Sequence, residues 1–192
     1  DSVVLTGDMI DGGPKTLKRD VQPLAKIVAR HGVYGVTGNH EYYYGVHAWS
    51  SIFKKLGVDM LYNEHRVISV GEADLVIAGV PDPRAERFGD IPPDLEKALK
   101  DAPNTTCILL AHQPSVAADN QNVDIQFSGH THGGIMFFLK HIVASFNNGF
   151  VQGLYKLDDK KLYVSPGTGI WNGFSCRIGV SSEITHIILH PE

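Results

Sequence analysis

Four short apolar stretches of the sequence each run into a turn that carries metal-binding types of side chain. Each stretch has the length and composition of a buried strand. The stretches are residues 3–6, 34–37, 108–111 and 125–128, and the turns after them begin at Gly7-Asp8, Gly38-Asn39-His40-Glu41, His112 and Gly129-His130-Thr131-His132. Ligands of open α/β sheets bind beyond the carboxyl ends of the strands, so neighbouring strands would bring these turns together. The pattern predicts an α/β fold with a polar site at one edge of its sheets.

The remaining pattern predicts helices between the early strands and a hairpin in the second half. We expect a helix over 14–32, although Pro23 within it disfavours an unbroken one, and shorter helices over 47–57 and 94–102. Further strands are expected over 65–71, 74–80 and 183–189, with a hairpin over 152–165 that turns at Asp158–Lys160. This mixture favours α/β layers around two mixed sheets.

Composition limits the function classes. A chain of 192 residues suits one domain over 1–192, and a net charge of −4 argues against a broad nucleic-acid surface. Two cysteines are too few for a disulfide framework. No apolar run approaches the about 20 residues of a membrane-spanning helix.

The ligand types indicate a class of metal. Imidazoles mixed with a carboxylate suit Mn, Fe or Zn better than an all-oxygen Mg or Ca cage. Asp8 has two oxygens and can bridge two ions, Asn39 offers an amide oxygen, and His112 completes one ion's shell. His130 and His132 can turn toward different ions. Two ions about 3.5–4 Å apart would hold a phosphate and activate a water.

Each motif alone also has a structural interpretation. A Gly-Asp turn is common and a single histidine at a strand end is usually structural, so the prediction rests on all four turns together. We interpret Asp11 as a helix cap or a support for the site. Structural or solvated roles are favoured for the remaining histidines, for Tyr42, Tyr43 and Tyr44, and for Arg84 and Arg87. For residues 135–146, a buried hairpin is favoured over an apolar wall for a lipid-bearing substrate.

The segments "GDMID", "GNHE", the "AH" at His112 and "GHTH" match, in order, motifs of the calcineurin-like metallophosphoesterase superfamily, which this sequence resembles. "GHTHGG", "GLYKLDDKKLYVSPGTG" and "SSEITHIIL" are most similar to its bacterial, often membrane-attached branch. Some members of that branch hydrolyse the pyrophosphate of a lipid-linked nucleotide sugar. The resemblance implies an α/β/β/α sandwich with the metal site at the carboxyl ends of strands.

The resemblance also implies roles for particular residues. Asp8 would bridge two divalent ions, with Asn39, His112 and His130 around the second ion and His132 beside the first. Asn39 and His40 would contact the substrate, and His40 would protonate the leaving oxygen. A metal-bound hydroxide would attack a phosphodiester, phosphomonoester or pyrophosphate in line.

One family motif, D-x-H, has no counterpart before Asp8. We therefore expect the first strand to lie upstream of this chain, and the first ion, held by Asp8 and His132, to bind weakly. The expected substrate is a small-molecule or lipid-linked phosphoester, with no nucleic-acid partner. Membrane contact, and attachment of the full-length protein to a bacterial membrane, are hypotheses. The alternative is a catalytically impaired metal-binding or protein-interaction scaffold, against which the presence of His40 argues.

Overall fold

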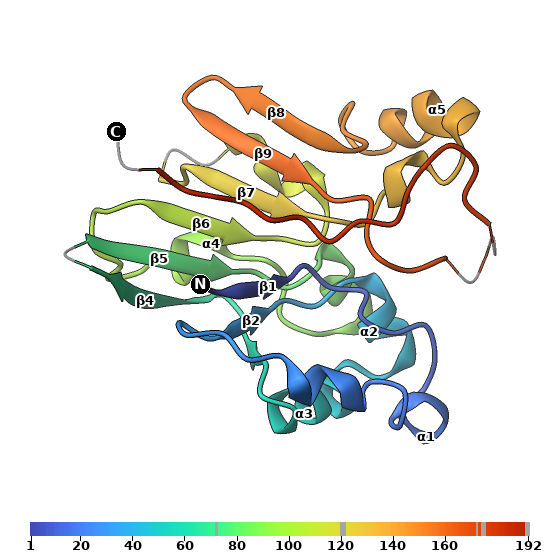
Figure 1. The fold of residues 1–192 in the computed structure, drawn as a ribbon, viewed down its shortest axis with the longest axis horizontal. Helices are drawn as coiled ribbons and strands as arrows, with labels where there is room; N and C mark the ends of the chain where they lie inside the picture. Colours follow the sequence, from blue (N-terminus) through green and yellow to red (C-terminus); the bar gives the residue numbers. More distant parts are fainter. Residues whose placement is uncertain (72, 120–121, 172, 174–175, 191–192) are drawn as a thin grey trace.

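The computed structural model describes residues 1–71, 73–119, 122–171, 173 and 176–190. Within these residues the strands form two sheets (Figure 1). The smaller sheet contains, in spatial order, β1 (Val3–Leu5), β2 (Val33–Gly35) and β3 (Asp59–Met60). The larger contains, in spatial order, β4 (Glu64–Val70), β5 (Ala73–Gly79), β6 (Cys107–Leu110), β7 (Ile125–Ser128), β9 (Lys160–Val164) and β8 (Gly153–Leu157). The predicted α/β fold with two sheets is confirmed.

The two sheets differ in strand direction. In the larger sheet β5, β6, β7 and β9 run parallel, and β4 and β8 pair antiparallel at its two edges. The smaller sheet is parallel throughout its described strands, so the prediction that both sheets are mixed is wrong for this one. Its strands are joined by helical crossovers rather than tight hairpins, and such crossovers connect parallel strands.

Helical segments in the described residues are short, and five of them are α-helices. These are α1 (Pro14–Leu17), α2 (Asn39–Tyr44), α3 (Val46–Lys55), α4 (Leu95–Ala98) and α5 (Lys140–Ser145). The 3-10 helices are η1 (Gln22–Lys26), η2 (Pro83–Phe88), η3 (Pro114–Asp119), η4 (His132–Gly134) and η5 (Phe137–Leu139). None of the helices in these residues is long and apolar enough to cross a bilayer.

The space between the sheets is filled by alternate side chains of their strands. Ile108 and Leu110 of β6 point into a cluster that also contains Tyr34 and Val36, from β2 and the residue after it. Successive side chains of a strand point to opposite faces, so the residues between them must pack elsewhere. One face of the larger sheet therefore packs on the smaller sheet.

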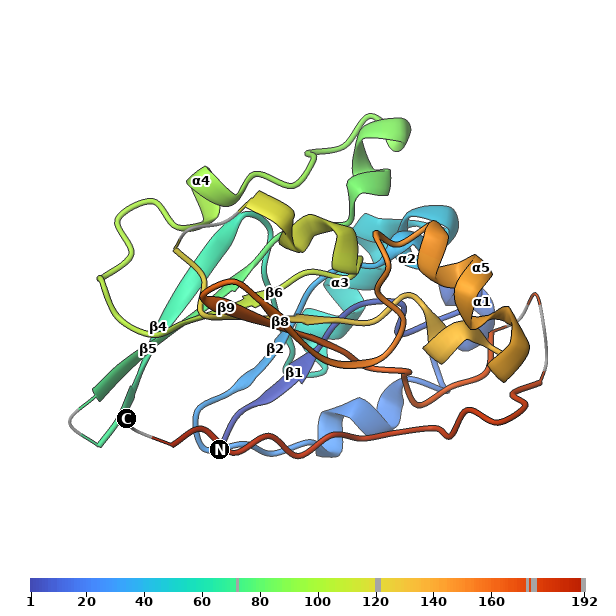
Figure 2. The same ribbon diagram turned by 90° about the horizontal axis from the view of Figure 1, so that it is seen from above.

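The two outer faces of the sheets are covered by helices. Cys107 and Leu109 of β6 pack in a cluster with Ala98 of α4. Trp49 and Phe53 of α3 are fully buried in a cluster on the outer face of the smaller sheet. Figure 2 shows α4 on the opposite side of the larger sheet from β1 and β2. The order of layers is helix, sheet, sheet, helix, as the resemblance implied.

The predicted helix over 14–32 is wrong as a single element. It is replaced by α1, which ends at Leu17, and by the 3-10 helix η1, which ends at Lys26. Pro23 lies at the start of η1, where its missing N–H is tolerated. Ile27 is extended, so the remainder up to Gly32 leaves the helical conformation.

Two further elements differ from prediction. Residues 135–146 form η5 and α5 instead of a buried hairpin, and the side chains of Phe137, Phe138, Ile142 and Phe146 are exposed. Residues 183–189 run extended but are assigned to no sheet, and Ile184 is exposed. Alternating apolar residues predicted a strand there, but a strand also needs an edge with which to pair.

The hairpin prediction is confirmed by β8 and β9, which pair antiparallel across a turn that follows Leu157. Asp94 caps α4 through a hydrogen bond that its side chain accepts from Lys97 N.

Candidate metal centre

The four predicted ligand turns converge because their strands are neighbours in pairs. β1 and β2 are adjacent in the smaller sheet, and β6 and β7 are adjacent in the larger one. Ligand atoms of Asp8, His112 and His130 lie within 4.8 Å of one another. Nε2 of His112 is 3.0 Å from Oδ2 of Asp8 and 3.2 Å from Nδ1 of His130. One side chain from the smaller sheet and two from the larger one therefore form a group that can hold a metal ion.

Asn39 and His40 join this group from the first turn of α2. Oδ1 of Asn39 is 3.2 Å from Nε2 of His112. The backbone N–H of His40 donates to Oδ1 of Asp8 at 2.9 Å, and Nε2 of its ring lies 3.9 Å from Oδ2 of the same carboxylate. The carboxylate of Asp8 is thus oriented by the turn that carries Asn39 and His40.

Two glycines let the turns of the smaller sheet approach each other. A Cβ at Gly7 would lie 2.4 Å from Gly38 N, and a Cβ at Gly38 would lie 2.1 Å from Oδ1 of Asp8. Neither position has room for a side chain unless the backbone moves. The glycines of these two motifs therefore set the distance between Asp8 and Asn39.

Three of the candidate ligands have an uncommon backbone conformation. Asp8, His130 and His132 have φ angles of 52°, 71° and 49°, in the left-handed region. Residues other than glycine seldom adopt this conformation, and such strain concentrates at functional sites. Among the described residues, five others that are not glycine share this conformation, so it is not confined to the site, but it sets the direction of three candidate ligands.

Nε2 of His112 is the atom whose surroundings best fit a cation. Nδ1 of the same ring is 2.7 Å from the carbonyl oxygen of Thr6, to which it donates, as ligand histidines commonly do to a backbone carbonyl. That bond leaves Nε2 facing the oxygens of Asp8 and Asn39 and a nitrogen of His130. The oxygens of Asp8 and Asn39 and the nitrogen of His130 carry lone pairs, and a cation placed among them would be stabilised by all three. The donor set of carboxylate, amide and two imidazoles fits a transition-metal ion.

Electrostatic interactions in the site bind Asp8 and His112 as an ion pair. Burial alone would raise the pKa of the Asp8 carboxyl, but the charge and hydrogen bond of His112 lower it well below its usual range. Burial opposes protonation of His112, yet the charge and hydrogen bond of Asp8 raise its pKa to about 9. Without a metal ion, a proton on His112 balances the carboxylate.

The other two histidines are held neutral. Burial and the charge of His112 lower the pKa of His130 to about 3. Burial and the charge of Arg177 lower the pKa of His132. Nδ1 of His132 is buried and has no hydrogen-bond partner among the described residues. A neutral, unpaired imidazole nitrogen is available as a metal ligand.

Asp11, predicted as a helix cap or a support for the site, is hydrogen-bonded to a site residue. Oδ1 of Asp11 lies 2.8 Å from Nδ1 of His40. This contact orients the ring so that Nε2 faces Asp8. α1 has no side-chain cap, which leaves the supporting role as the one the structure fits.

Sequence reasoning assigned no role to Glu41, which connects the two turns of the smaller sheet. Its carboxylate is fully buried and accepts hydrogen bonds from Gly38 N at 2.7 Å, Asp8 N at 2.9 Å and Met9 N at 2.8 Å. Burial and the charge of Asp8 raise the pKa of Glu41 to about 7. A glutamate three residues after Gly38 has capping-box spacing, and this signal could have identified it.

Most residues that were assigned structural or solvated roles fit them. Tyr42 is buried, His65 hydrogen-bonds the carbonyl of Ala98, and the side chain of His47 is 85% exposed. Burial and the charge of His112 are the larger causes of the lowered pKa of His130. The charge of Arg84 also contributes to lowering it, so Arg84 lies near the site. Tyr43 is exposed rather than packed under the loop.

Comparisons with known proteins agree with this architecture. Residues 1–134 match the family model described as calcineurin-like phosphoesterase. The chain is 40% identical to an uncharacterized metallophosphoesterase of Campylobacter jejuni, over 96% of the chain and 49% of that protein. It is 38% identical to the transmembrane protein with metallophosphoesterase domain of Danio rerio, over 98% of the chain and 46% of that protein.

The chain spans about half the length of these curated relatives. Among solved structures, it matches the sulfate thiohydrolase SoxB of Thermus thermophilus with a TM-score of 0.58 and 18% identity, over 84% of this chain and 33% of that one. This last likeness concerns the fold alone. The family match, the two-sheet fold and the convergent ligand turns together show that the chain belongs to the calcineurin-like phosphoesterase family.

Proposed function

We propose that the protein hydrolyses phosphoester bonds with divalent metal ions bound at Asp8, Asn39, His112 and His130. The observation that carries this proposal is the ring of acceptors around Nε2 of His112, which lie at 3.0 to 3.2 Å. A buried site of this kind needs a cation, and its donors suit Mn, Fe or Zn.

The first ion of the family arrangement would be held by Asp8 and His132. Asp8 has two carboxylate oxygens, and the unpaired Nδ1 of His132 is a free ligand atom. Bound ions in such sites lower the pKa of a coordinated water and neutralise the charge of a phosphoryl group.

His40 is the proposed acid. Its Nδ1 is fixed by Asp11 at 2.8 Å, so Nε2 faces the carboxylate of Asp8 and the neighbouring metal centre. A proton delivered from Nε2 to the leaving oxygen would stabilise the departing alcohol, which is the role of a general acid. Asn39, beside it in the same turn, would contact the phosphoryl group as well as an ion.

The proposed substrate is a phosphodiester, phosphomonoester or pyrophosphate. Hydrolysis of bis(4-nitrophenyl) phosphate and of 4-nitrophenyl phosphate, measured with added Mn²⁺, Fe²⁺ or Zn²⁺ and after chelation, tests the activity. We expect turnover that depends on the added ion. Tight binding of the ion with no turnover of either compound would instead favour a metal-binding scaffold.

Membrane contact is a second proposal, supported by the exposed apolar side chains of η5 and α5. Phe138, Ile142 and Phe146 follow one another at intervals of four residues and are exposed. A relative is named a transmembrane protein with metallophosphoesterase domain. Co-sedimentation with anionic liposomes should weaken when all three side chains are replaced by serine. Equal co-sedimentation of the two forms would exclude this surface.

A further inference from the structure

The side chains next to His40 define where the leaving group of a substrate must lie. This inference rests on the proposed function, in which His40 protonates the leaving oxygen. The group bonded to that oxygen must then extend past the His40 ring. The ring centroid of Tyr43 lies 5.5 Å from that of His40, at an interplanar angle of 47°. An exposed aromatic side chain therefore lies beside the ring of the proposed acid.

A second aromatic ring continues this surface. The ring of Phe88, at the end of η2, lies 5.9 Å from the ring of Tyr43 on α2. Tyr43 is 46% exposed and Phe88 is 51% exposed, and neither belongs to a hydrophobic cluster of the described residues. Core packing does not account for this pair, and grouped exposed apolar side chains commonly mark binding surfaces.

η2 borders the metal centre as well as α2. Asp82, the N-cap residue of η2, accepts a hydrogen bond at its Oδ1 from Nε2 of Gln113, the residue after His112, at 3.1 Å. Ala85, a residue of η2, is buried against Tyr42 and Val46. The position of Phe88 beside the site is thus fixed by packing of η2 on the helix that carries His40.

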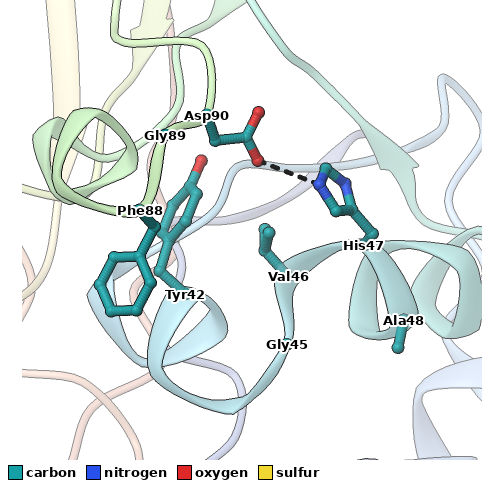
Figure 3. Close-up of a pocket in the computed structure, with 8 residues that line it drawn as sticks. All are labelled: Tyr42, Gly45, Val46, His47, Ala48, Phe88, Gly89 and Asp90. Carbon is teal, nitrogen blue, oxygen red and sulfur yellow. Dashed lines mark ion pairs between the residues drawn. The ribbon is translucent and has the colours of Figure 1, made fainter.

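Beyond Phe88 lies a cavity of about 280 Å³, which Figure 3 shows. The Phe88 and Tyr42 rings form part of its lining, with centroids 6.2 Å apart. Asp90 and His47 contribute the polar part, with Oδ2 of Asp90 3.4 Å from Nε2 of His47. The aromatic surface therefore leads to a pocket whose polar side is the His47–Asp90 pair.

We infer that Tyr43 and Phe88 determine specificity by binding a planar aromatic ring carried by the leaving group of the substrate. Flat π-faces bind such rings better than saturated rings of the same size. The ring has two chemical sources. An aryl group bonded close to the leaving oxygen would contact Tyr43, and a nucleobase one pentose away would reach Phe88 and the pocket beyond it.

Two matched pairs of substrates test this inference with the metal-loaded protein. The first pair is benzyl methyl phosphate and cyclohexylmethyl methyl phosphate, whose leaving alcohols are of similar acidity. The second pair consists of uridine and ribose, each carrying a methyl phosphate diester on its 5′ oxygen. Only the uridine compound has the base. The readout is the ratio of kcat/KM for the planar ring over its saturated or base-free partner.

We expect the wild-type protein to favour the planar ring about three- to tenfold in at least one pair. Tyr43→Leu and Phe88→Leu should lower that ratio toward one, and Tyr43→Phe, which keeps the ring, should retain it. A larger effect of Tyr43→Leu in the benzyl pair indicates an aryl group. A larger effect of Phe88→Leu in the uridine pair indicates a nucleobase.

Phe146→Leu is the matched control, because Phe146 is another exposed aromatic residue and has no ring contact with His40 in the structure. A wild-type ratio of one in both pairs, an unchanged ratio in the Tyr43 and Phe88 leucine variants, or an equal effect of Phe146→Leu would overturn the inference. If bis(4-nitrophenyl) phosphate is hydrolysed, such results refute the aromatic platform alone. If no phosphoester is hydrolysed, the proposed function fails and the platform fails with it.

Discussion

Nε2 of His112 lies 3.0 Å from Oδ2 of Asp8, although the two residues come from strands of different sheets. The other nitrogen of the ring is bonded to the carbonyl of Thr6, two residues before Asp8. One imidazole thus joins the larger sheet to the turn of the smaller one. The metal centre and the contact between the sheets are built from the same residues.

Metal binding should release a proton, because His112 carries one in the metal-free site. Its pKa is raised to about 9 through Asp8, so below that pH an incoming ion must displace a proton. The apparent affinity for Mn²⁺ should rise by about tenfold per pH unit from pH 7 to about 9 and then level off. His130, whose pKa is lowered to about 3, is already neutral over this range and adds no dependence. Titration calorimetry in buffers of different ionisation enthalpy measures the released protons. An affinity independent of pH would contradict the ion pair.

Replacement of His40 should impair catalysis without removing the metal. We expect His40→Ala to lower kcat by about two to four orders of magnitude for a phosphodiester with an alkyl leaving group. The loss should be much smaller for a 4-nitrophenyl leaving group, which departs without a proton. Bound Mn²⁺, measured by elemental analysis, should match the wild type. Equal losses for both leaving groups would remove His40 from the role of acid.

Glu41 should hold the two turns of the smaller sheet together. Glu41→Ala leaves three backbone N–H groups without their acceptor in a buried site, which should lower the free energy of unfolding by about 3 kcal/mol or more. Glu41→Gln keeps one acceptor oxygen, so a smaller loss is expected. Urea unfolding of both variants measures the difference. Stability equal to the wild type in Glu41→Ala would show that these bonds are dispensable.

Gly38 should be intolerant of a side chain. In Gly38→Ala the new Cβ would overlap Oδ1 of Asp8, so the turns must separate and metal affinity should fall at least about tenfold. Gly13→Ala is the matched control, because a Cβ there meets nothing within 4 Å. Equilibrium dialysis against Mn²⁺ compares the two variants. Wild-type affinity in Gly38→Ala would mean that the backbone adjusts without cost to the site.

Much of the site could be predicted because strand ends are encoded locally. The apolar stretch before Asp8 and the one before His130 predicted both strands and the turns after them, and sheet geometry then predicted that the turns meet. The first step needed only local sequence, whereas the second depended on the condition that the strands are neighbours, which the order of strands in the two sheets meets. What the sequence lacked was any local sign of the hydrogen bonds from Asp8 and Met9 to Glu41, which join residues more than 30 positions apart.

The errors in the fold prediction also have physical causes. Periodicity favoured a helix through Pro23, but this proline removes a backbone donor and the chain forms a 3-10 helix around it. Around Ile142, apolar residues were assumed to be buried, whereas the structure exposes them on α5. An apolar segment is expected to pack against another apolar surface. Its composition does not show whether that surface belongs to the protein's own core.

The central claim is that phosphoester hydrolysis depends on an ion held by Asp8 and its neighbours. The most direct test is to titrate chelator-treated protein with Mn²⁺ and to measure bound ion and hydrolysis of bis(4-nitrophenyl) phosphate together. The proteins compared are the wild type, Asp8→Asn and His186→Ala. His186→Ala is the control, because it changes an exposed histidine outside the site. We expect activity to be absent after chelation and to return in proportion to bound ion in the wild type and His186→Ala, but not in Asp8→Asn. Full activity of the metal-free protein, or full recovery of Asp8→Asn at the same Mn²⁺ concentration, would contradict the account.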